Sequence, residues 1–229
     1  MVADRSYHGG AGEAFAARVN APGLNSLHER PAVLELIGDV GSQRIADLGC
    51  GAGNYLVELA RRGAQVTGVD GSQALVAHAH MAAGVGAQVV HHDLEQPLAF
   101  LNDHSQDGVL CALVLHHLND RPQFLKEVHR ILRPGGWLVV SSTHPTADWG
   151  RFGGSYFDQR WVTRPLDDRY SIEYQLIPLS ILVNELLDAG FVLDKMIEPQ
   201  PSLELKQADP QRYEELRAAP IFLALRLHT

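Results

Sequence analysis

Residues 47–55 read Asp-Leu-Gly-Cys-Gly-Ala-Gly-Asn-Tyr, and this stretch lies between a short apolar run and a segment with helical spacing. Glycine occupies every second position at Gly49, Gly51 and Gly53, so the turn carries almost no side-chain bulk. Because the first amides of a helix have no partner within the helix, a ligand can lie against this backbone. The stretch therefore predicts a strand, a tight turn and a helix that together hold a cofactor.

The charge beside the turn indicates which cofactor fits. A dinucleotide loop follows the pattern G-x-G-x-x-G, and Asn54 stands where that pattern needs its last glycine. Asp47 ends the strand, beside the place of a bound pyrophosphate, where its carboxylate repels phosphate and attracts a cation. A ligand with an ammonium and a sulfonium at one end and a free ribose at the other satisfies both observations. The sequence therefore favours S-adenosylmethionine.

Two further acids support this cofactor. Asp70 follows the apolar stretch 65–69 and lies 21 residues after Gly49, the range in which an acid meets the hydroxyls of an adenosine ribose. Asp93 follows a third apolar stretch and is a candidate for binding the adenine amino group. The acids at positions 47, 70 and 93 are each separated by 23 residues. Three successive strands are therefore expected to present one acid each at the same edge of a sheet.

Residues 44 to about 142 resemble a class I S-adenosylmethionine-dependent methyltransferase. The resemblance rests on the glycine turn, Asp70, the pair Asp93-Leu94 and the segment 124–140, which contains Leu-Arg-Pro-Gly-Gly before a strand pattern. It continues more weakly to the C-terminus. It implies an α/β fold with a Rossmann-like, doubly wound sheet of seven strands in the order 3-2-1-4-5-7-6. It also implies methyl transfer with S-adenosylhomocysteine as the product, but it does not give the acceptor.

The residue pattern and the resemblance together predict a set of cofactor-binding residues, most of them on loops at one edge of the sheet. The candidates are Asp47, Gly49, Cys50, Gly51, Asp70, Gly71, Asp93, Leu94, Cys111 and, in the N-terminal segment, Asn25.

Length and composition limit the classes of protein that fit. A chain of 229 residues that is 45% hydrophobic can bury the core of one α/β domain. A net charge of −8 without a cluster of lysine and arginine in the sequence disfavours a nucleic-acid substrate. No apolar run is long enough to span a membrane, and no leader pattern opens the chain. Two cysteines do not make a disulfide framework, so we expect a cytoplasmic protein without a membrane partner.

Apolar periodicity predicts alternating strands and helices, as in a parallel sheet covered on both faces. Helical spacing also marks residues 26–38, near the N-terminus. The predicted strands are 44–48, 65–69, 87–92, 107–112, 136–142, 191–198 and 220–227. The predicted helices of the core and C-terminus are 53–62, 72–83, 120–132, 178–189 and a short one near 210–218.

The chain is expected to be a single domain, 1–229, with four parts. Residues 1–40 would form an N-terminal helical lid, 41–142 the cofactor-binding core, 143–177 a small inserted cap over the acceptor, and 178–229 the last helix and strands. The cap is predicted from composition, because seven of the 16 aromatic residues fall within residues 143–175.

Methyl transfer from a sulfonium needs alignment and a dry site, and a base only if the acceptor loses a proton. His116 and His117 end the fourth strand pattern, at the edge where the donor methyl is expected. The resemblance places an acceptor base at the position of His117, while His116 would turn back toward the cofactor or the protein. A free imidazole titrates near 6.5, which suits proton transfer at neutral pH. Tyr7, on the predicted lid, is a second catalytic candidate. Its hydroxyl would bind the methionine carboxylate of the cofactor or contact His117.

The aromatic cap favours a flat, largely apolar acceptor, because aromatic side chains stack on rings. The predicted acceptor pocket consists of His144, Trp149, Tyr156, Phe157, Trp161 and Tyr174. A small aromatic or natural-product-like metabolite, as in secondary metabolism, would be methylated on oxygen, nitrogen or an electron-rich carbon. Adjacent histidines point apart in extended chain and carry no ligand spacing, so no metal site is expected. The oligomeric state is not predicted.

Two alternatives remain open at this point. One is an NAD(P)-dependent oxidoreductase on a similar sheet, which would bind a dinucleotide at the same loop. The other is a non-catalytic module that binds the cofactor and needs neither a base nor an acceptor pocket.

Overall fold

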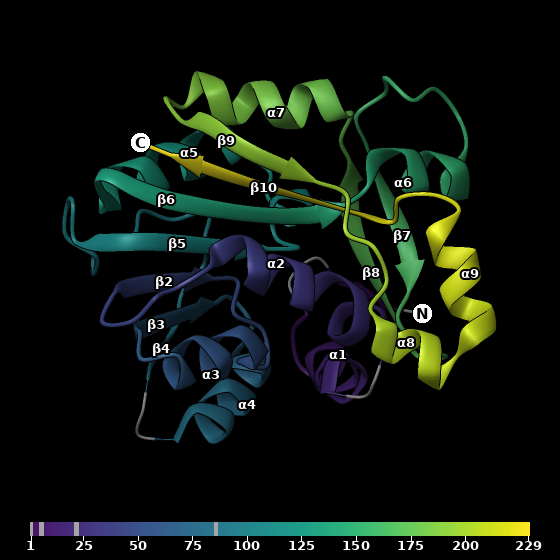
Figure 1. The fold of residues 1–229 in the computed structure, drawn as a ribbon, viewed down its shortest axis with the longest axis horizontal. Helices are drawn as coiled ribbons and strands as arrows, with labels where there is room; N and C mark the ends of the chain where they lie inside the picture. Colours follow the sequence, from purple (N-terminus) through teal and green to yellow (C-terminus); the bar gives the residue numbers. More distant parts are fainter. Residues whose placement is uncertain (1, 5–6, 21–22, 85–86) are drawn as a thin grey trace.

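The computed structural model describes residues 2–4, 7–20, 23–84 and 87–229 (Figure 1). Within this part of the chain the central sheet has seven strands. They are β2 (Arg44–Leu48), β3 (Gln65–Asp70), β4 (Gln88–His91), β5 (Gln106–Ala112), β6 (Leu132–Thr143), β9 (Val192–Ile197) and β10 (Phe222–His228). Their order is β4-β3-β2-β5-β6-β10-β9, and β10 alone among the described strands of this sheet runs antiparallel to its neighbours. Numbered within the sheet, this order is 3-2-1-4-5-7-6, because β1, β7 and β8 belong to a second sheet.

Helices cover both faces of the central sheet. They are α2 (Arg30–Ile37), α3 (Asn54–Arg61), α4 (Gln73–Ala83), α5 (Arg121–Ile131) and α7 (Leu179–Asp188). Successive residues of a strand point to opposite faces. Leu138 and Val140 of β6 accordingly pack in one apolar cluster with α5 and α7, whereas Val139 packs in another with α2, α3 and α4. The fold is therefore the doubly wound α/β class that the sequence predicts.

Local signals place most of these elements where the sequence predicts them. Helix α4 begins after Ser72, whose hydroxyl accepts the Leu75 amide, and α5 begins after Asp120, whose carboxylate accepts the Gln123 amide. The fifth strand was predicted to begin at 136, but β6 begins at Leu132. Its pairing with β5 shifts register before Trp137, and Gly135 adopts φ +74° there. The Pro-Gly-Gly segment, residues 134–136, therefore forms a bulge within the strand.

The predicted helix 26–38 is divided into two parts. Residues Asn25–Glu29 form a π-helical turn, labelled η1, and α2 follows. Pro31 lies in the first turn of α2 and has no amide hydrogen to give to the carbonyl of Leu27. That carbonyl accepts the Ser202 amide instead, at 3.1 Å. The wide turn therefore joins the N-terminal region to the C-terminal segment.

Residues beyond the carboxyl ends of the strands form a separate layer (Figure 1). Its elements are α1 (Gly10–Asn20), α6 (Pro145–Phe152), β1 (Val2–Asp4), β7 (Arg160–Pro165) and β8 (Tyr170–Leu176). The strands form a small sheet in the order β1-β8-β7. The sequence predicted the cap only from its aromatic content, and it did not predict this sheet. Strand β1 is contributed by the N-terminus, more than 160 residues from its partner β8.

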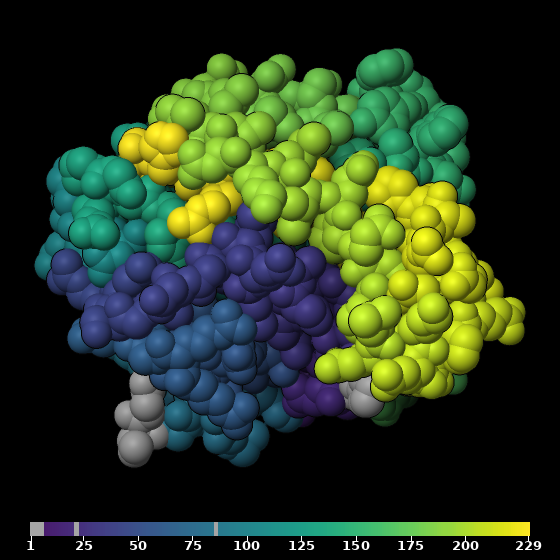
Figure 2. Space-filling view, in the orientation of Figure 1, coloured from purple at the N-terminus to yellow at the C-terminus, as the bar shows by residue number. Residues whose placement is uncertain are grey.

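The C-terminal connection contains two helices, α8 (Leu203–Ala208) and α9 (Pro210–Arg217), where one short helix was predicted. Ser202 begins α8 by accepting the Leu205 amide, and Asp209 begins α9 by accepting the Arg212 amide. In the space-filling view these helices (yellow) lie over the N-terminal helices (purple) at the same end of the molecule (Figure 2). Helix α8 contacts η1 directly.

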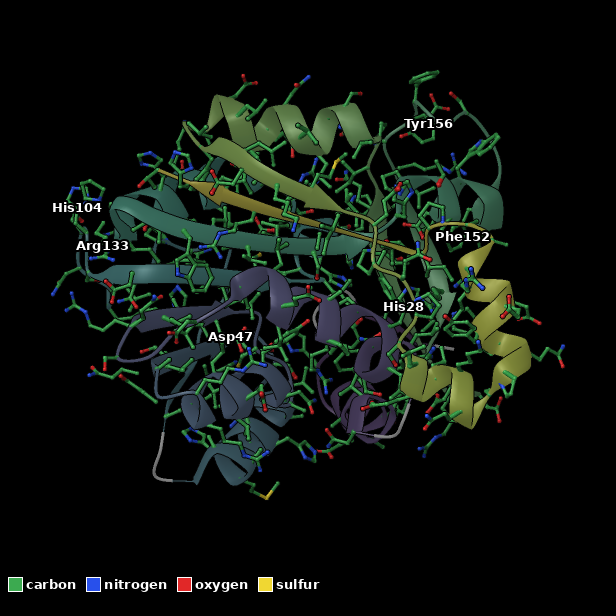
Figure 3. All side chains as sticks on the ribbon, in the orientation of Figure 1. His28, Asp47, His104, Arg133, Phe152 and Tyr156 are labelled. Carbon is green, nitrogen blue, oxygen red and sulfur yellow. The ribbon has the colours of Figure 1, made fainter. Side chains whose placement is uncertain are left out.

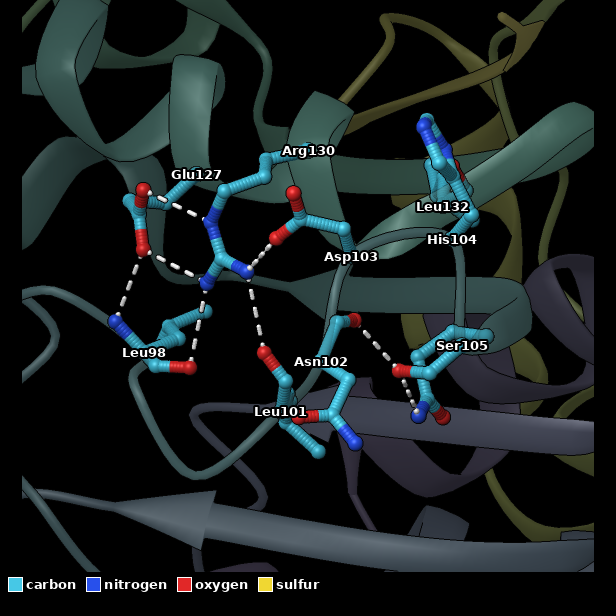
Figure 4. Close-up of polar contacts among 10 residues, drawn as sticks. Leu98, Leu101, Asn102, Asp103, His104, Ser105, Glu127, Arg130 and Leu132 are labelled. Atoms are coloured by element: carbon cyan, nitrogen blue, oxygen red, sulfur yellow. Dashed lines mark hydrogen bonds and ion pairs between the residues drawn. The ribbon is translucent and has the colours of Figure 1, made fainter.

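Arg130 of α5 fixes the loop between β4 and β5 (Figure 4). It donates hydrogen bonds to the carbonyls of Leu98 and Leu101 at 3.1 and 3.0 Å and pairs with Glu127 and Asp103. Glu127 accepts the Leu98 amide in turn, at 2.9 Å. Since the first part of this loop contains Asp93, these contacts hold one side of the candidate site in position.

A close contact between β5 and β6 provides a test of the core. A Cβ at Gly108 would lie 2.1 Å from the Trp137 ring. We expect Gly108→Ala to lower the free energy of unfolding by about 1–3 kcal/mol through overpacking. Gly150→Ala is the control, because that helical position has open space and Ala favours helix. Urea unfolding measures both variants, and an unchanged midpoint for Gly108→Ala would contradict the packing.

Candidate active site

A cavity of about 1080 Å³ opens at the carboxyl ends of the strands, between the core, the N-terminal helices and the cap. Twelve of the residues predicted for the site line it. They are Tyr7, Asn25, Gly49, Cys50, Gly51, Asp70, Gly71, Asp93, Leu94, His116, His117 and Tyr174. Segments far apart in sequence therefore meet in one chamber, which is large enough for a cofactor and a small second ligand.

Asp47 and Cys111 are buried in the sheet and do not form the cavity wall. Figure 3 shows Asp47 within the core, among the strands and helices. These two predicted cofactor-binding residues therefore do not reach the cavity. The reason is strand alternation, since a residue near a strand end points either into the sheet or toward the open edge.

Five of the six residues predicted for the acceptor pocket do not line this cavity. They are His144, Trp149, Tyr156, Phe157 and Trp161.

Four of these five side chains have positions that the structure defines by their contacts or exposure. His144 is buried at the start of α6, where Nδ1 accepts the Thr146 amide and Nε2 lies 3.1 Å from Glu198. Trp149 and Phe157 are 47% and 77% exposed. Tyr156 lies in the outer loop of the cap, and its hydroxyl accepts the Leu179 amide (Figure 3). Aromatic content predicted that a cap exists, but not which of its rings face inward.

The glycine turn has the geometry of a ligand cradle. Gly49, Gly51 and Gly53 all adopt positive φ, at +80°, +55° and +84°. A Cβ at Gly49 would lie 2.2 Å from Val114, so the turn can be built only without a side chain there. The amide of Gly49 donates to the carbonyl of Val69, which ties the turn to the end of β3.

Asp70 holds this turn in place. Its Oδ2 accepts the Gly51 amide and its Oδ1 accepts the Ser72 amide, both at 2.8 Å. The hydroxyl of Ser72 donates to the carbonyl of Tyr7 at 2.6 Å, so the N-terminal segment is attached to the same point. Each carboxylate oxygen keeps a further lone pair for a ribose hydroxyl. Asp70 is therefore both a structural support of the turn and a ligand candidate.

Asp47 lies beneath the turn as a buried acid. Its Oδ2 has no hydrogen-bond partner among the described residues. Burial, with a smaller contribution from the nearby charge of Asp70, raises the pKa of Asp47 to about 7. Burial also raises the pKa of Asp70. Two buried acids side by side are an environment that a positively charged ligand would stabilise and that is unsuitable for a pyrophosphate.

His117 lies on the opposite side of the cavity, at the end of the short 3-10 helix Leu115–His117. Its Nδ1 lies 3.2 Å from the carbonyl of Glu173, so Nδ1 carries the hydrogen and Nε2 keeps its lone pair. The ring of Tyr7 packs edge-on against the imidazole at 5.4 Å. Burial lowers the pKa of His117 to about 4, well below the value expected for a free imidazole.

His116 lines the cavity and is also in contact with the protein. Its Nδ1 lies 3.4 Å from the hydroxyl of Ser142, and its ring packs against Tyr174 at 5.3 Å. Burial lowers its pKa, and the charges of His117, Arg164 and Arg121 lower it further. His116 is therefore neutral and supports the position of its neighbours.

Sequence reasoning missed a polar cluster at the π-helical turn. Glu29 is buried, and it accepts hydrogen bonds from Tyr55 at 2.8 Å and from Ser141 at 2.5 Å. Arg30 lines the cavity, and its guanidinium lies 5.7 Å from the Tyr55 ring centre. The buried Nε of Arg30 has no partner among the described residues. The adjacent Pro31, in a segment otherwise typical of a helix, was the signal that could have identified this turn.

Three arginines and one acid on the cap side were also missed. Arg18 of α1, Arg151 of α6 and Arg164 of β7 line the cavity together with Asp148. They come from segments that the sequence gives no reason to place together. In a chain with a net charge of −8, they form a local excess of positive charge.

Comparisons with known proteins agree with this geometry. Residues 46–140 match the family described as Methyltransferase domain. A Haemophilus influenzae protein of uncharacterised function is 25% identical over 210 residues, which cover 80% of each chain. A ubiquinone biosynthesis O-methyltransferase of Alkalilimnicola ehrlichii is 32% identical over 112 residues, 48% of this chain and 45% of that one. The match therefore spans about half the length of that relative.

A solved structure extends the similarity over almost the whole chain. An S-adenosylmethionine-dependent methyltransferase from Mesorhizobium loti superimposes with a TM-score of 0.73 at 27% identity, covering 90% of this chain and 100% of that one. The fold and the buried acids define a Rossmann-like enzyme for a cationic adenosyl cofactor. The chain is a class I S-adenosylmethionine-dependent methyltransferase, and S-adenosylmethionine is its cofactor. A nicotinamide oxidoreductase and a non-catalytic module are thereby set aside.

In the part of the chain that the structure describes, no group of three or more His, Cys, Asp or Glu side chains is arranged to hold a metal ion. None of the helices described is both long and apolar enough to cross a membrane.

The raised pKa of Asp47 predicts a pH dependence of cofactor binding. A cation favours the ionised carboxylate, so binding should release a proton below pH 7 and tighten as pH rises. For a pKa of about 7, the affinity for S-adenosylhomocysteine, which keeps the ammonium, should rise about tenfold from pH 6 to pH 8. Calorimetry measures this. Asp47→Asn should remove the slope and Asp93→Asn should keep it, whereas an unchanged slope in Asp47→Asn would contradict the assignment.

Proposed function

We propose that this methyltransferase acts on a small acceptor with a ring, at oxygen, nitrogen or an electron-rich carbon, and that His117 is the base. The observation that carries this proposal is the position of the His117 imidazole. It lies in the cavity wall, its Nδ1 is engaged by a carbonyl, and its Nε2 is left with a lone pair. The similarity to a ubiquinone biosynthesis O-methyltransferase favours oxygen among the three acceptor atoms.

The cofactor side is proposed to be built from residues around the glycine turn. Asp70 and Gly71 would bind the ribose, and Asp93 with Leu94 would bind the adenine. Asp47 would act through its charge from beneath the turn. Asn25 and Arg30 would bind the methionine carboxylate, since both line the cavity and the Arg30 guanidinium has a buried nitrogen without a partner.

The chemistry needs little more than alignment. S-adenosylmethionine supplies a methyl group activated by its sulfonium. The chain's own residues would hold the acceptor in line, exclude water and accept a proton at Nε2 of His117. Because its pKa is about 4, this imidazole is neutral at pH 7 and ready to accept a proton, although it is a weak base. Such a base suits an acceptor whose acidity rises as the new bond forms.

The four parts of the chain have proposed roles in this scheme. Residues 1–40 would act as a lid, which the contact of Ser72 with the Tyr7 carbonyl supports. Residues 41–142 would bind the cofactor, and 178–229 would complete the sheet. Residues 143–177 would form the acceptor cap, because Tyr174 and Arg164 reach the cavity from there.

The base assignment predicts the pH profile of turnover. With a pKa of about 4 for His117, turnover should stay flat from pH 5.5 to pH 8 and should not fall near 6.5 as it would for an exposed imidazole. His117→Gln should lower turnover by about 10²- to 10⁴-fold while cofactor affinity is unchanged. Transfer of labelled methyl to a panel of hydroxylated and aminated ring compounds provides the assay.

His104→Gln is the matched control, because His104 lies outside the cavity and its ring Nδ1 lies 3.0 Å from the carbonyl of Leu132. Undiminished turnover in His117→Gln would show that alignment alone carries the reaction. Absence of S-adenosylhomocysteine binding in the wild type would instead reject the cofactor side of the proposal.

A further inference from the structure

Three guanidinium groups gather on the cap side of the cavity. Arg18 comes from α1, Arg151 from α6 and Arg164 from β7, and all three line the cavity. They are close enough for the charges of Arg151 and Arg18 to lower the pKa of Arg164, in addition to the larger effect of burial. Like charges at this range repel one another, so the fold holds them together against an electrostatic cost.

The protein itself neutralises these charges only in part. Within the described residues, neither Arg151 nor Arg164 makes a hydrogen bond or an ion pair, and Arg18 donates only to the carbonyl of Leu166, at 3.2 Å. Asp148 is the acid near them, but its two oxygens already accept hydrogen bonds from Thr143 at 2.6 Å and from Tyr174 at 2.8 Å. Three positive charges therefore face one carboxylate that is already engaged.

Solvent can stabilise the charges of Arg18 and Arg151, because both residues are exposed. It stabilises the charge of Arg164 less well, because that residue is half-buried. A guanidinium is an unusual group to desolvate without an acceptor, because buried charges are normally paired. Its planar fork matches the two oxygens of a carboxylate or the oxygens of a phosphate. The arrangement therefore points to an anionic ligand in the cavity.

The position of Arg164 assigns this anion to the acceptor and not to the cofactor. Arg164 interacts with Tyr174 and Tyr7, and both of these rings pack around His117, at 6.4 and 5.4 Å. The glycine turn has its own guanidinium, since Arg30 lies over the ring of Tyr55 in the helix that follows the turn. The methionine carboxylate and a second anion would thus each have a separate partner.

We propose that the methyl acceptor carries an anionic oxyacid group, a carboxylate or a phosphate, which Arg164 binds together with Arg151 and Arg18. The acceptor would lie with this group against the cap and its nucleophilic atom toward His117 and the donor methyl. The proposal rests on the proposed function and deepens it by one property of the substrate. It involves binding alone and adds no chemical step.

The test uses the full-length protein saturated with S-adenosylhomocysteine, so that the methionine carboxylate site is already filled. Benzoate, phenyl phosphate and the uncharged isostere benzamide are then titrated by calorimetry. The two anions should bind at least about tenfold more tightly than benzamide, and their affinity should fall with added salt. The tighter of the two anions identifies the oxyacid group.

Arg164→Gln should weaken binding of the anions about tenfold or more and leave the affinity for S-adenosylhomocysteine unchanged. Arg169→Gln is the matched control, because it removes the same charge from the same hairpin at an exposed position outside the cavity. Arg151→Gln, at an exposed position, provides a second measurement of anion affinity that does not depend on how Arg164→Gln folds. Circular dichroism shows whether each variant is folded.

Equal binding of benzoate, phenyl phosphate and benzamide would overturn the proposal, as would no measurable anion binding at millimolar concentration. Displacement of S-adenosylhomocysteine by the anions, or its weakened binding in folded Arg164→Gln, would assign the arginines to the cofactor and also overturn it. Failure of the wild type to bind S-adenosylhomocysteine at all is a different result, which rejects the proposed function.

Discussion

The site depends on the two amide hydrogen bonds that the Asp70 carboxylate accepts, from Gly51 in the glycine turn and from Ser72 at the start of α4. These bonds fix the turn relative to the end of β3. They also hold the N-terminal segment at Tyr7, because the hydroxyl of Ser72 donates to the carbonyl of Tyr7. One side chain thus sets the positions of the glycine turn and of this part of the N-terminal segment. This arrangement buries the Asp70 carboxylate beside that of Asp47, which is unfavourable, and a cationic ligand would offset the unfavourable free energy.

The parts of the fold that the sequence predicted well are those with strong local causes. Apolar runs of strand length, glycines that require positive φ, and the capping residues Ser72 and Asp120 act within a few residues of where they stand. The Pro31 turn and the bulge at Gly135 are exceptions, because each depends on a partner distant in sequence. The carbonyl of Leu27 is satisfied by Ser202, and the shifted pairing of β6 is fixed by β5.

The same distinction between local causes and partners distant in sequence applies to the candidate site. Residues next to the glycine turn were predicted, because the motif and the strand ends specify them together. The residues of the cap that face the cavity were not predicted, since aromatic content does not reveal which rings face inward. Tyr174 points to the cavity through the alternation of β8, whereas Phe157 stands on the outer loop. Arg18 joins Arg151 and Arg164 because β1 pairs with β8 of the cap hairpin and α1 packs against the same strand. No local sequence pattern predicts a parallel pairing across that separation.

His117 and Asp47, which are both buried, make the stability of the fold depend on pH in opposite directions. The pKa of His117 falls from 6.5 to about 4, so between these values the unfolded chain binds more protons and stability rises with pH. The pKa of Asp47 rises from 3.8 to about 7, so across that range the folded protein binds more protons and stability falls with pH. Above pH 7 His117 is neutral in both states and no longer lowers the stability of the fold. Burial of the ionised Asp47 still lowers it. A cation bound near Asp47 removes this remaining cost, so the cofactor should raise the unfolding temperature more at pH 8 than at pH 6.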